Sequence, residues 1–462
     1  MSSAPKTASA PAVRWAWDLY RETLLWKLRR CLRSRSGAPE VPSPCLLIYP
    51  DRVQENIRRM IRIGGRVERM RPHIKTHKLV EVLKMQMEQG ITRFKCATVA
   101  EAEMAAACGA PDVLLAYQPV GPNVHRLIRL LKSFPQTEFS VIADDAEAIR
   151  ALSEAAAAAG LGSAHGPRAP VGGAPSGTAP GDSHASNPAT RDENFPAGRR
   201  EEHAGGVCSP ELEVLLDLDC GQHRTGVSPG PKAVELYRLI GSLSGLKPGG
   251  LHAYDGHIHD VDVTVRTKNC DAAFAPVAAL RQELLQARLP VPRVVVGGTP
   301  TFPMHARRGD VECSPGTCVF WDASYGNKFA DLDFLPAALV LTRVISKPGS
   351  NRLCLDLGHK AIASEMPHPR VQFLNLSEAK ALMHSEEHLV VETTHADDFA
   401  VGDCLYGLPW HICPTVALHS EAVVIEGGKA AQRYANSETA SPESIFIRAH
   451  SRYSESGSRH EP

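Results

Sequence analysis

The sequence predicts an α/β protein in which a (β/α)8 barrel of the TIM type is followed by a mostly-β C-terminal domain. Three observations lead to this prediction. The chain has 462 residues, which is enough for two or three domains. Between residues 41 and 334, short apolar runs alternate with segments of helical periodicity, the pattern of a parallel sheet with helical crossovers. From residue 335 onward the segments become short and alternate in polarity, which favours β structure.

The strand-then-helix units follow one another in order. The first predicted strand covers residues 45–49, and Asp51 can cap the helix that continues to residue 60. Later strands are predicted at 94–98, 113–117, 139–142, 212–218, 249–254 and 293–297, and the helices between them at 100–108, 124–131, 146–157, 231–243 and 271–287. In the second domain, strands are predicted at 338–345, 352–357 and 389–393.

Three boundaries divide the chain into four segments. Residues 1–40 form a basic N-terminal extension, residues 41–334 the barrel, residues 335–432 the β domain, and residues 433–462 a terminal strand with a polar tail. Residues 160–210 interrupt the barrel with a segment rich in Gly, Pro, Ala, Ser and His, which predicts a disordered insertion. The extension has near-helical apolar spacing and is predicted to pack on the body or on a partner subunit. Its basic character leaves an organellar targeting peptide or a membrane-surface helix as the alternative.

Composition narrows the possible partners. Lys+Arg and Asp+Glu both number 51, and a net charge of zero argues against nucleic acid or an acidic membrane as the main partner. The 12 cysteines show no C-x-x-C spacing and there is no secretory signal, which indicates free thiols in a reducing, cytoplasmic compartment. No apolar run approaches the roughly 18 residues of a membrane span. A small-molecule ligand is therefore expected.

The segment RPHIKTHK contains the first candidate for chemistry, Lys75. A lysine just after a short strand can project from the C-terminal mouth of a barrel, where the active sites of barrel enzymes lie. A desolvated amine near other cations is nucleophilic enough to form a Schiff base, and Arg71, His73, His77 and Lys78 are its neighbours in the sequence. A phosphate-binding or merely solvated basic loop is the alternative.

Two glycine-containing turns suggest a phosphate site. Gly298 and Thr299 follow a buried strand, and Gly316 and Thr317 follow about one repeat later. Free backbone N–H groups and a threonine hydroxyl can cradle a phosphate, and such sites on barrels commonly follow the last strands. Either segment alone could be a structural turn that binds no phosphate. Together with a Schiff-base lysine they suggest pyridoxal 5′-phosphate (PLP).

A candidate metal pair lies in the second domain. His411 and Cys413 are two residues apart, and in an extended segment such residues point to the same face. Imidazole and thiolate suit Zn²⁺ better than Mg²⁺ or Ca²⁺. Two protein ligands fit an open site that water or substrate completes. A histidine at a strand end beside a buried cysteine is the alternative.

Two further side chains follow predicted barrel strands. Arg224 lies just past the strand at 212–218, and Tyr254 ends the strand at 249–254. Both therefore face the same mouth as Lys75. A structural Arg–Asp pair and a tyrosine that only lines the rim are the alternatives.

This ordered set of motifs resembles the metal-activated D-threonine aldolase and D-serine dehydratase family, whose barrel is similar to that of alanine racemase. The match runs from about residue 42 to residue 453. The motifs are RPHIKTHK from Arg71, DLDCGQHRTG from Asp217, YDGHIH from Tyr254, GGTPT from Gly297, DLGHKA from Asp356, SEEH from Ser385 and HICPT from His411.

The resemblance implies a role for each candidate. Lys75 carries PLP, Arg224 faces the pyridine nitrogen, Tyr254 lies beside the ring, and His411 with Cys413 binds a divalent metal. The phosphate is held by Thr299, Gly316 and Thr317. Zinc is the expected metal. Manganese and magnesium are alternatives because the aldolases of the family resemble a His-x-Asp pattern at these two positions, and Asp is a harder ligand than Cys.

The implied activity is that of a lyase on D-3-hydroxy amino acids. On ligand chemistry, His-x-Cys favours the dehydratase route, in which D-serine gives pyruvate and ammonia. The alternative is retro-aldol cleavage of D-threonine to glycine and acetaldehyde. An amino-acid racemase and a non-catalytic PLP-binding protein are more remote. A homodimer is expected only by analogy.

Overall fold

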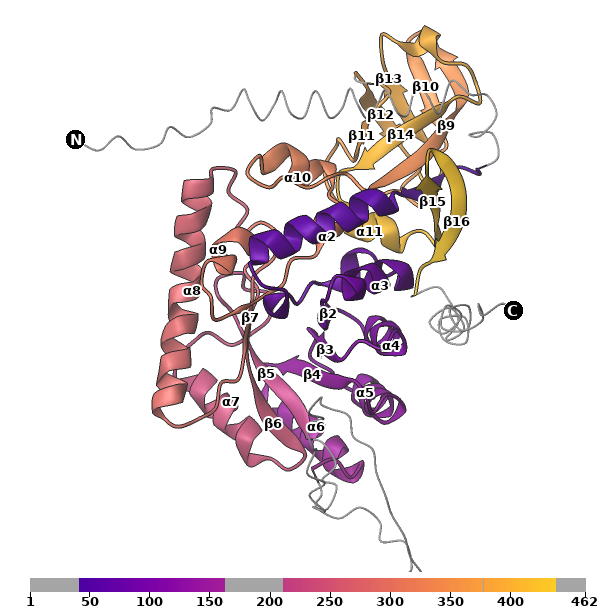
Figure 1. Ribbon diagram of the computed structural model, residues 1–462. Helices are drawn as coiled ribbons and strands as arrows, with labels where there is room; N and C mark the ends of the chain where they lie inside the picture. The colour runs from indigo at the N-terminus through magenta and orange to yellow at the C-terminus, as the bar shows by residue number, and fades with distance from the viewer. Residues whose placement is uncertain (1–40, 163–210, 377, 438–462) are drawn as a thin grey trace, which may run out of the picture.

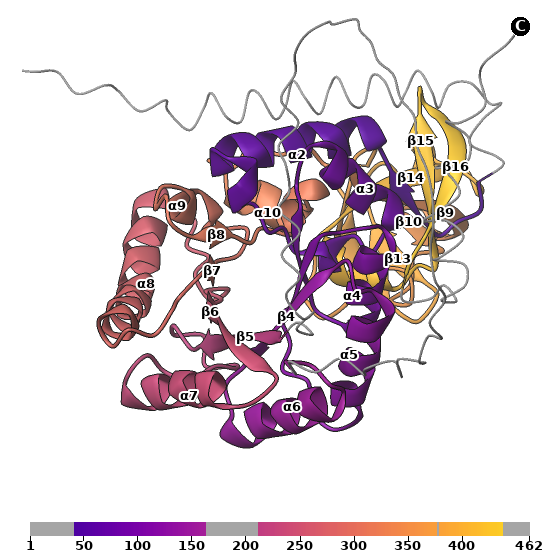
Figure 2. The same ribbon diagram turned by 60° about the horizontal axis from the view of Figure 1, so that its bottom comes forward.

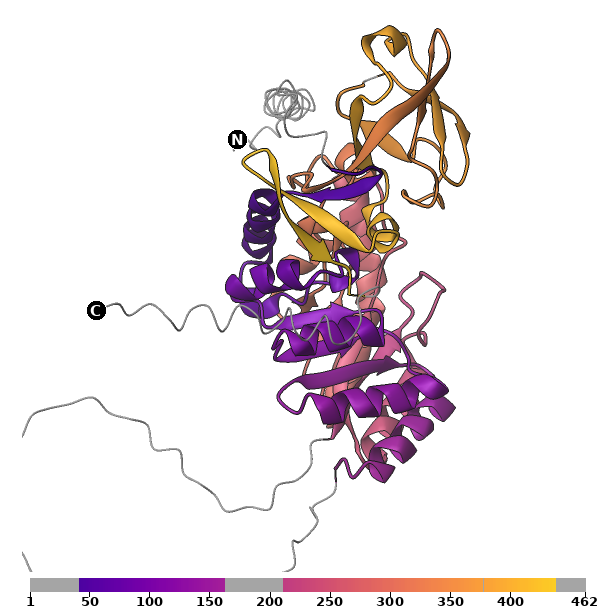
Figure 3. The ribbon, with the colours of Figure 1, turned by 90° about the vertical axis from the view of Figure 1, so that its right-hand side faces the viewer.

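The computed structural model describes residues 41–162, 211–376 and 378–437. The predicted extension at 1–40, nearly all of the insertion at 160–210 and the polar tail lie outside the described residues. The described part has two regions, a barrel and a β-rich region beside one end of it (Figures 1 and 3). None of its helices combines the length and apolar character that crossing a bilayer requires. Its ten cysteines are all free thiols, as predicted.

A parallel sheet forms most of the barrel wall. Seven strands pair in chain order, each with the next, which confirms the predicted α/β alternation. They are β2 Arg93–Cys96, β3 Asp112–Leu115, β4 Glu138–Ala143, β5 Leu212–Leu218, β6 Leu246–Ala253, β7 Val294–Val296 and β8 Glu312–Cys313.

The eighth position in the wall is filled by residues 70–73. Met70 forms a parallel bridge with Cys313 of β8, and His73 forms one with Lys95 of β2. The backbone N–H of Arg71 donates to the Cys313 carbonyl at 2.9 Å, and that of Lys95 donates to the carbonyl of Pro72 at 3.0 Å. The barrel is thus closed, as the (β/α)8 prediction requires.

Helices surround the barrel (Figure 2). Asp145 caps α6 and Asp262 caps α8, each accepting two backbone N–H bonds, and Thr98 caps α4. The helices are α2 Pro50–Gly64, α3 Val80–Glu88, α4 Val99–Ala107, α5 Pro122–Ser133, α6 Ala146–Ala158, α7 Pro231–Ser242, α8 Val263–Gln286, α9 Phe302–Ala306, α10 Ala323–Lys328 and α11 Ile412–Ala417. Short 3-10 turns are η1 Val67–Arg69, η2 Ile74–Thr76, η3 Thr317–Val319 and η4 Ala396–Asp398.

The second region is a mixed sheet. Its nine strands are β1 Cys45–Ile48, β9 Ala338–Gly349, β10 Arg352–Leu355, β11 Val371–Phe373, β12 Lys380–His384, β13 Leu389–Glu392, β14 Cys404–Pro409, β15 Glu421–Glu426 and β16 Lys429–Ala435. The predicted β domain is confirmed in type, but its last strand, β16, runs across the boundary predicted at residue 432.

The first predicted barrel strand lies in this second sheet instead. β1 pairs antiparallel with β9 and parallel with β15. The placement of residues 45–49 in the barrel was therefore wrong. A buried four-residue run shows that a strand exists, but it carries no information about which sheet accepts it.

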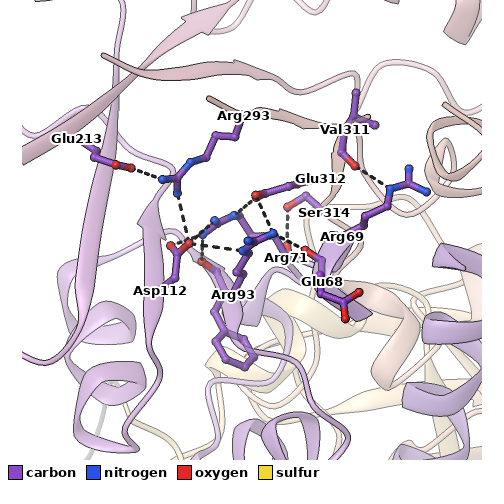
Figure 4. A network of polar contacts seen from close by, with 11 residues as sticks. Glu68, Arg69, Arg71, Arg93, Asp112, Glu213, Arg293, Val311, Glu312 and Ser314 are labelled. Atoms are coloured by element: carbon purple, nitrogen blue, oxygen red, sulfur yellow. Dashed lines mark hydrogen bonds and ion pairs between the residues drawn. The ribbon is translucent and has the colours of Figure 1, made fainter. Parts of the chain in front are cut away.

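The N-terminal ends of the barrel strands are joined by ion pairs (Figure 4). Arg71 is fully buried and binds Asp112 through two N–H···O contacts of 2.7 Å, while its Nε lies 2.5 Å from Glu312. Arg93 also contacts Glu312, at 3.2 Å, and Arg293 contacts Asp112, at 3.3 Å. Charged groups at this end are stabilising contacts, because barrel active sites lie at the other end.

Candidate active site

Lys75 lies at the C-terminal mouth of the barrel. Residues 70–73 run parallel to the other barrel strands, so the turn η2 that follows them carries Lys75 to the edge where all the strands end. The Lys75 backbone N–H donates to the His73 imidazole at 3.3 Å, which fixes the start of the turn. The side chain is half-buried. The predicted position of Lys75 is confirmed by this geometry; its role remains a prediction.

The cations that surround Lys75 differ from those its sequence neighbours suggest. Arg71 points to the opposite end of the barrel, and the Lys78 ammonium is bonded to the Glu101 carboxylate. The second ammonium at the mouth belongs to Lys95, on the adjacent strand β2. In a strand, adjacent residues point to opposite sides, so closeness in sequence does not bring these side chains together.

The Tyr254 ring is the centre of the mouth. Lys75 Nζ lies 6.0 Å from the ring centroid, Lys95 Nζ 5.7 Å, and Arg224 Cζ 5.0 Å. Burial raises the pKa of Tyr254, although Arg224 opposes that effect, so the phenol is protonated at neutral pH. A Cβ on Gly298 would lie 3.0 Å from Cε2 of the ring, closer than ordinary van der Waals contact, so glycine leaves room for the ring. Lys75, Arg224, Tyr254 and Gly298 are therefore brought together as predicted.

The two predicted phosphate turns meet at one point. The Thr299 hydroxyl oxygen accepts from the backbone N–H groups of Gly316 and Thr317, each at 3.1 Å. A Cβ on Gly316 would lie 3.0 Å from Thr76 Oγ1 and 3.2 Å from the His73 carbonyl oxygen. The close backbone approach and the gathered N–H donors suit a phosphate group. The donor set beside Lys75 therefore fits PLP.

The metal pair lies at the start of a helix. His411 is the N-cap residue of α11 and Cys413 lies in its first turn, so the prediction of an extended segment was wrong. Pro414 lies in the first turn of this helix, where a proline is tolerated because its missing N–H has no partner within the helix. Cys413 Sγ lies 3.3 Å from Thr76 Oγ1 and 3.8 Å from Thr317 Oγ1. The pair thus reaches the residue next to Lys75.

The electrostatics of the pair favour a thiolate. Burial raises the pKa of Cys413, but the His411 imidazole more than offsets this effect, and the pKa is lowered overall. Burial opposes protonation of His411, whereas Cys413 and Glu365 favour it and raise its pKa to about 9. A metal binds the deprotonated thiol and the neutral imidazole, so metal binding must release the proton that His411 otherwise holds. The chemistry of the two donors therefore fits a zinc ion.

Glu365 is a residue that the sequence did not reveal. Its carboxylate lies 2.5 Å from His411 Nδ1, which leaves the other ring nitrogen toward Cys413. A carboxylate on the second nitrogen of a histidine ligand fixes the tautomer and the ring orientation. Glu365 lies 46 residues from His411 in an irregular segment, so no periodicity or spacing could have identified it.

Another group of potential ligands, Asp255, Cys270 and His305, is a hydrogen-bond network. Their ligand atoms lie within 4.8 Å of one another. Arg308 Nε donates to His305 Nδ1 at 3.2 Å, so the proton of the neutral imidazole is on Nε2 and is directed at Asp255, at 2.8 Å. That tautomer leaves no nitrogen lone pair for a metal. Asp255 follows Tyr254, and the network therefore holds that tyrosine.

Comparison with known families agrees with this architecture. Residues 48–171 and 200–323, more than half of the chain, match the model of the alanine racemase N-terminal domain. The chain belongs to this family. Residues 337–425 match a second model, described as a putative serine dehydratase domain.

Curated relatives extend over both regions. The chain is 28% identical over 406 residues to a 3-hydroxy-D-aspartate aldolase from Paracoccus denitrificans, and 26% identical over 393 residues to a D-threonine aldolase from Arthrobacter sp.. Each match covers 84% of this chain and 90% of the relative. The resemblance to the aldolase and dehydratase family is thereby confirmed.

Solved structures confirm the fold. A D-threonine aldolase from Filomicrobium marinum superposes with a TM-score of 0.70 at 24% identity, over 87% of this chain and 96% of that one. A D-threo-3-hydroxyaspartate dehydratase from Delftia sp. HT23 gives a TM-score of 0.66 at 22% identity, over 87% and 99%. Each superposition covers enough of this chain to include both the barrel and the β-rich region.

Proposed function

We propose that this protein is a PLP- and metal-dependent lyase of D-3-hydroxy amino acids and that its favoured reaction is the dehydration of D-serine. One observation carries the proposal: the Cys413 thiol lies 3.3 Å from the hydroxyl of Thr76, the residue next to Lys75. The amine and the metal pair therefore belong to a single site. Thr76 and Cys413 are 337 positions apart in the chain, one on the barrel and one on the second region.

The residues that would hold PLP surround the barrel mouth. Lys75 provides the covalent attachment, and Tyr254 provides an aromatic surface for the ring. Arg224 is the partner proposed for the pyridine nitrogen. Bound PLP withdraws electrons from the α-carbon of an amino acid. The phosphate contacts are assigned to Gly298, Thr299, Gly316 and Thr317.

His411 and Cys413 would hold the metal. Their nitrogen and sulfur donors favour zinc over magnesium or manganese. A metal with open positions can act as a Lewis acid on a substrate hydroxyl. A solved variant of D-threo-3-hydroxyaspartate dehydratase is described as metal-free, which supports a metal in that relative and, by analogy, here.

The chain's own groups can supply the acid–base steps. The Lys75 amine could act as the base that removes the α-proton of a bound amino acid. The β-hydroxyl would then leave on the side of His411 and Cys413, which together with the α-proton amounts to loss of water. The resulting enamine would take up water and release ammonia to give pyruvate.

Retro-aldol cleavage is the second candidate. It is favoured by the relatives with 28% and 26% identity, which are both named aldolases. In that reaction a base takes the proton of the β-hydroxyl, and the bond between the α- and β-carbons breaks. D-Threonine would then give glycine and acetaldehyde.

A homodimer is also proposed, by analogy with the family.

Product analysis separates the two reactions. Purified protein loaded with PLP and zinc is incubated with D-serine and with D-threonine, and pyruvate, glycine and acetaldehyde are measured. We expect pyruvate from D-serine, loss of that activity after treatment with a chelator, and recovery when zinc is added back. Acetaldehyde with glycine as the only products would establish the aldolase. Activity that a chelator leaves intact would remove the metal pair from the proposal.

Glu365→Gln should weaken metal binding. The substitution keeps the size of the side chain but removes the charge that holds His411 Nδ1, so we expect the zinc affinity to fall about 10- to 100-fold. Competition with a chromophoric chelator measures that affinity. Glu387→Gln, at an exposed glutamate paired with Lys360, is the matched control and should bind zinc normally. Equal zinc affinity in the two variants would show that Glu365 does not support the ligand.

A further inference from the structure

Lys95 is a second lysine whose side chain lies inside the barrel. In the sheet it is in register with Leu114, which belongs to the interior cluster of Leu114, Ile142, Leu215 and Val295. Neighbouring residues in register point to the same side of a sheet, so the Lys95 side chain also points inward. Only 2% of the residue is exposed.

Lys95 has no carboxylate partner. Among the residues that the structure describes, no carboxylate oxygen lies within the 4.0 Å of an ion pair with its ammonium. The nearby interior carboxylates have other partners. Asp217 lies 2.7 Å from His252 Nδ1 and accepts from the Thr225 hydroxyl at 2.9 Å, while Asp255 belongs to the hydrogen-bond network described above. A buried charge without a counter-ion is costly, so its presence needs an explanation.

The Lys95 ammonium lies at the proposed active site. It is 5.7 Å from the centroid of the Tyr254 ring, the same ring that Lys75 and Arg224 approach. Burial and the positive charge of Lys75 lower its pKa to about 7. An anion bound at the mouth would supply the missing counter-charge and keep the ammonium protonated.

We propose that Lys95 is the cationic partner of an anionic oxygen of the bound ligands, either the phenolic oxygen of PLP or the α-carboxylate of the amino acid. The inference rests on the proposed function. The phosphate is a less suitable partner because its contacts are already assigned to Gly298, Thr299, Gly316 and Thr317. Lys95 is then a binding residue of the site, separate from the lysine that carries the cofactor.

Two substitutions test the charge. Lys95→Met keeps most of the length of the side chain and removes the ammonium, whereas Lys95→Arg keeps a cation. PLP affinity is measured by fluorescence titration of the apoprotein, and KM for D-serine is measured with saturating PLP. A charge-assisted hydrogen bond predicts a loss of about tenfold or more in one of these quantities for Lys95→Met, with partial recovery in Lys95→Arg. Weaker PLP binding identifies the phenolic oxygen. Unchanged PLP binding with a raised KM identifies the carboxylate.

Ser140→Ala is the matched control. Ser140 is in register with Leu114 and is buried, and its hydroxyl has no hydrogen-bond partner within the described part of the chain, so its loss should change neither quantity. The apo forms are compared by melting temperature, which removal of an uncompensated charge should not lower. Should Lys95→Met nevertheless unfold, Lys95→Gln replaces it in both titrations. If PLP affinity and KM both stay within twofold of the wild-type values, the inference is overturned and the proposed function is unaffected. Wild-type protein that takes up no PLP would instead overturn the proposed function.

Discussion

Lys75→Ala should abolish attachment of the cofactor and lower lyase activity by several orders of magnitude. The side chain is the amine proposed for the Schiff base and also the base for the α-proton, so one substitution removes both functions. Borohydride reduction of the PLP-loaded protein followed by peptide mapping should find the cofactor on the peptide containing Lys75 in wild type and on no lysine in the variant.

Lys95 makes this experiment decisive. Its ammonium lies as near to the Tyr254 ring as that of Lys75, so the mouth contains two amines that could react with an aldehyde. Cofactor trapped on Lys95 in wild type would transfer the proposed attachment to that residue. Normal turnover in Lys75→Ala would contradict the proposed function itself.

Arg71→Met should destabilise the fold strongly. The guanidinium is fully buried and its loss would leave Asp112 and Glu312 without their main partner. Removing one member of a buried ion pair costs about 3–5 kcal/mol because a buried charge remains uncompensated. Urea unfolding followed by circular dichroism measures the change in the free energy of unfolding.

The matched control is an exposed arginine in an ion pair. Arg58 pairs with Glu55 on the surface of α2 and its side chain is 49% exposed, so Arg58→Met should cost less than about 1 kcal/mol. Equal losses for the two substitutions would show that the ion pairs at the N-terminal end of the barrel contribute no more than surface pairs.

The sequence predicted the barrel because strand and helix periodicities are local signals. Which strands pair with one another depends on residues far apart in the sequence, and for that reason β1 was placed in the wrong sheet. The short strand before Lys75 was predicted without bounds, since Pro72 has no backbone N–H and residues 70–73 form only single bridges on each side.

The candidate site was predicted where motifs concentrate chemistry in a few consecutive residues. Lys75, Thr299 and Cys413 come from such motifs, and the structure brings them together. Lys95 and Glu365 stand in segments without any such pattern. Their importance depends on what lies opposite them in space, which one chain's spacing cannot show.

The position of β1 has a consequence for dissecting the protein. This strand precedes every barrel element in the chain, yet both of its neighbours, β9 and β15, come after the barrel. A chain cut after residue 334 would therefore keep β1 but lose both strands that hydrogen-bond it. The two regions are interlocked by chain order and are not independent modules. During synthesis, residue 426 at the end of β15 must be added before β1 can form both of its strand pairings.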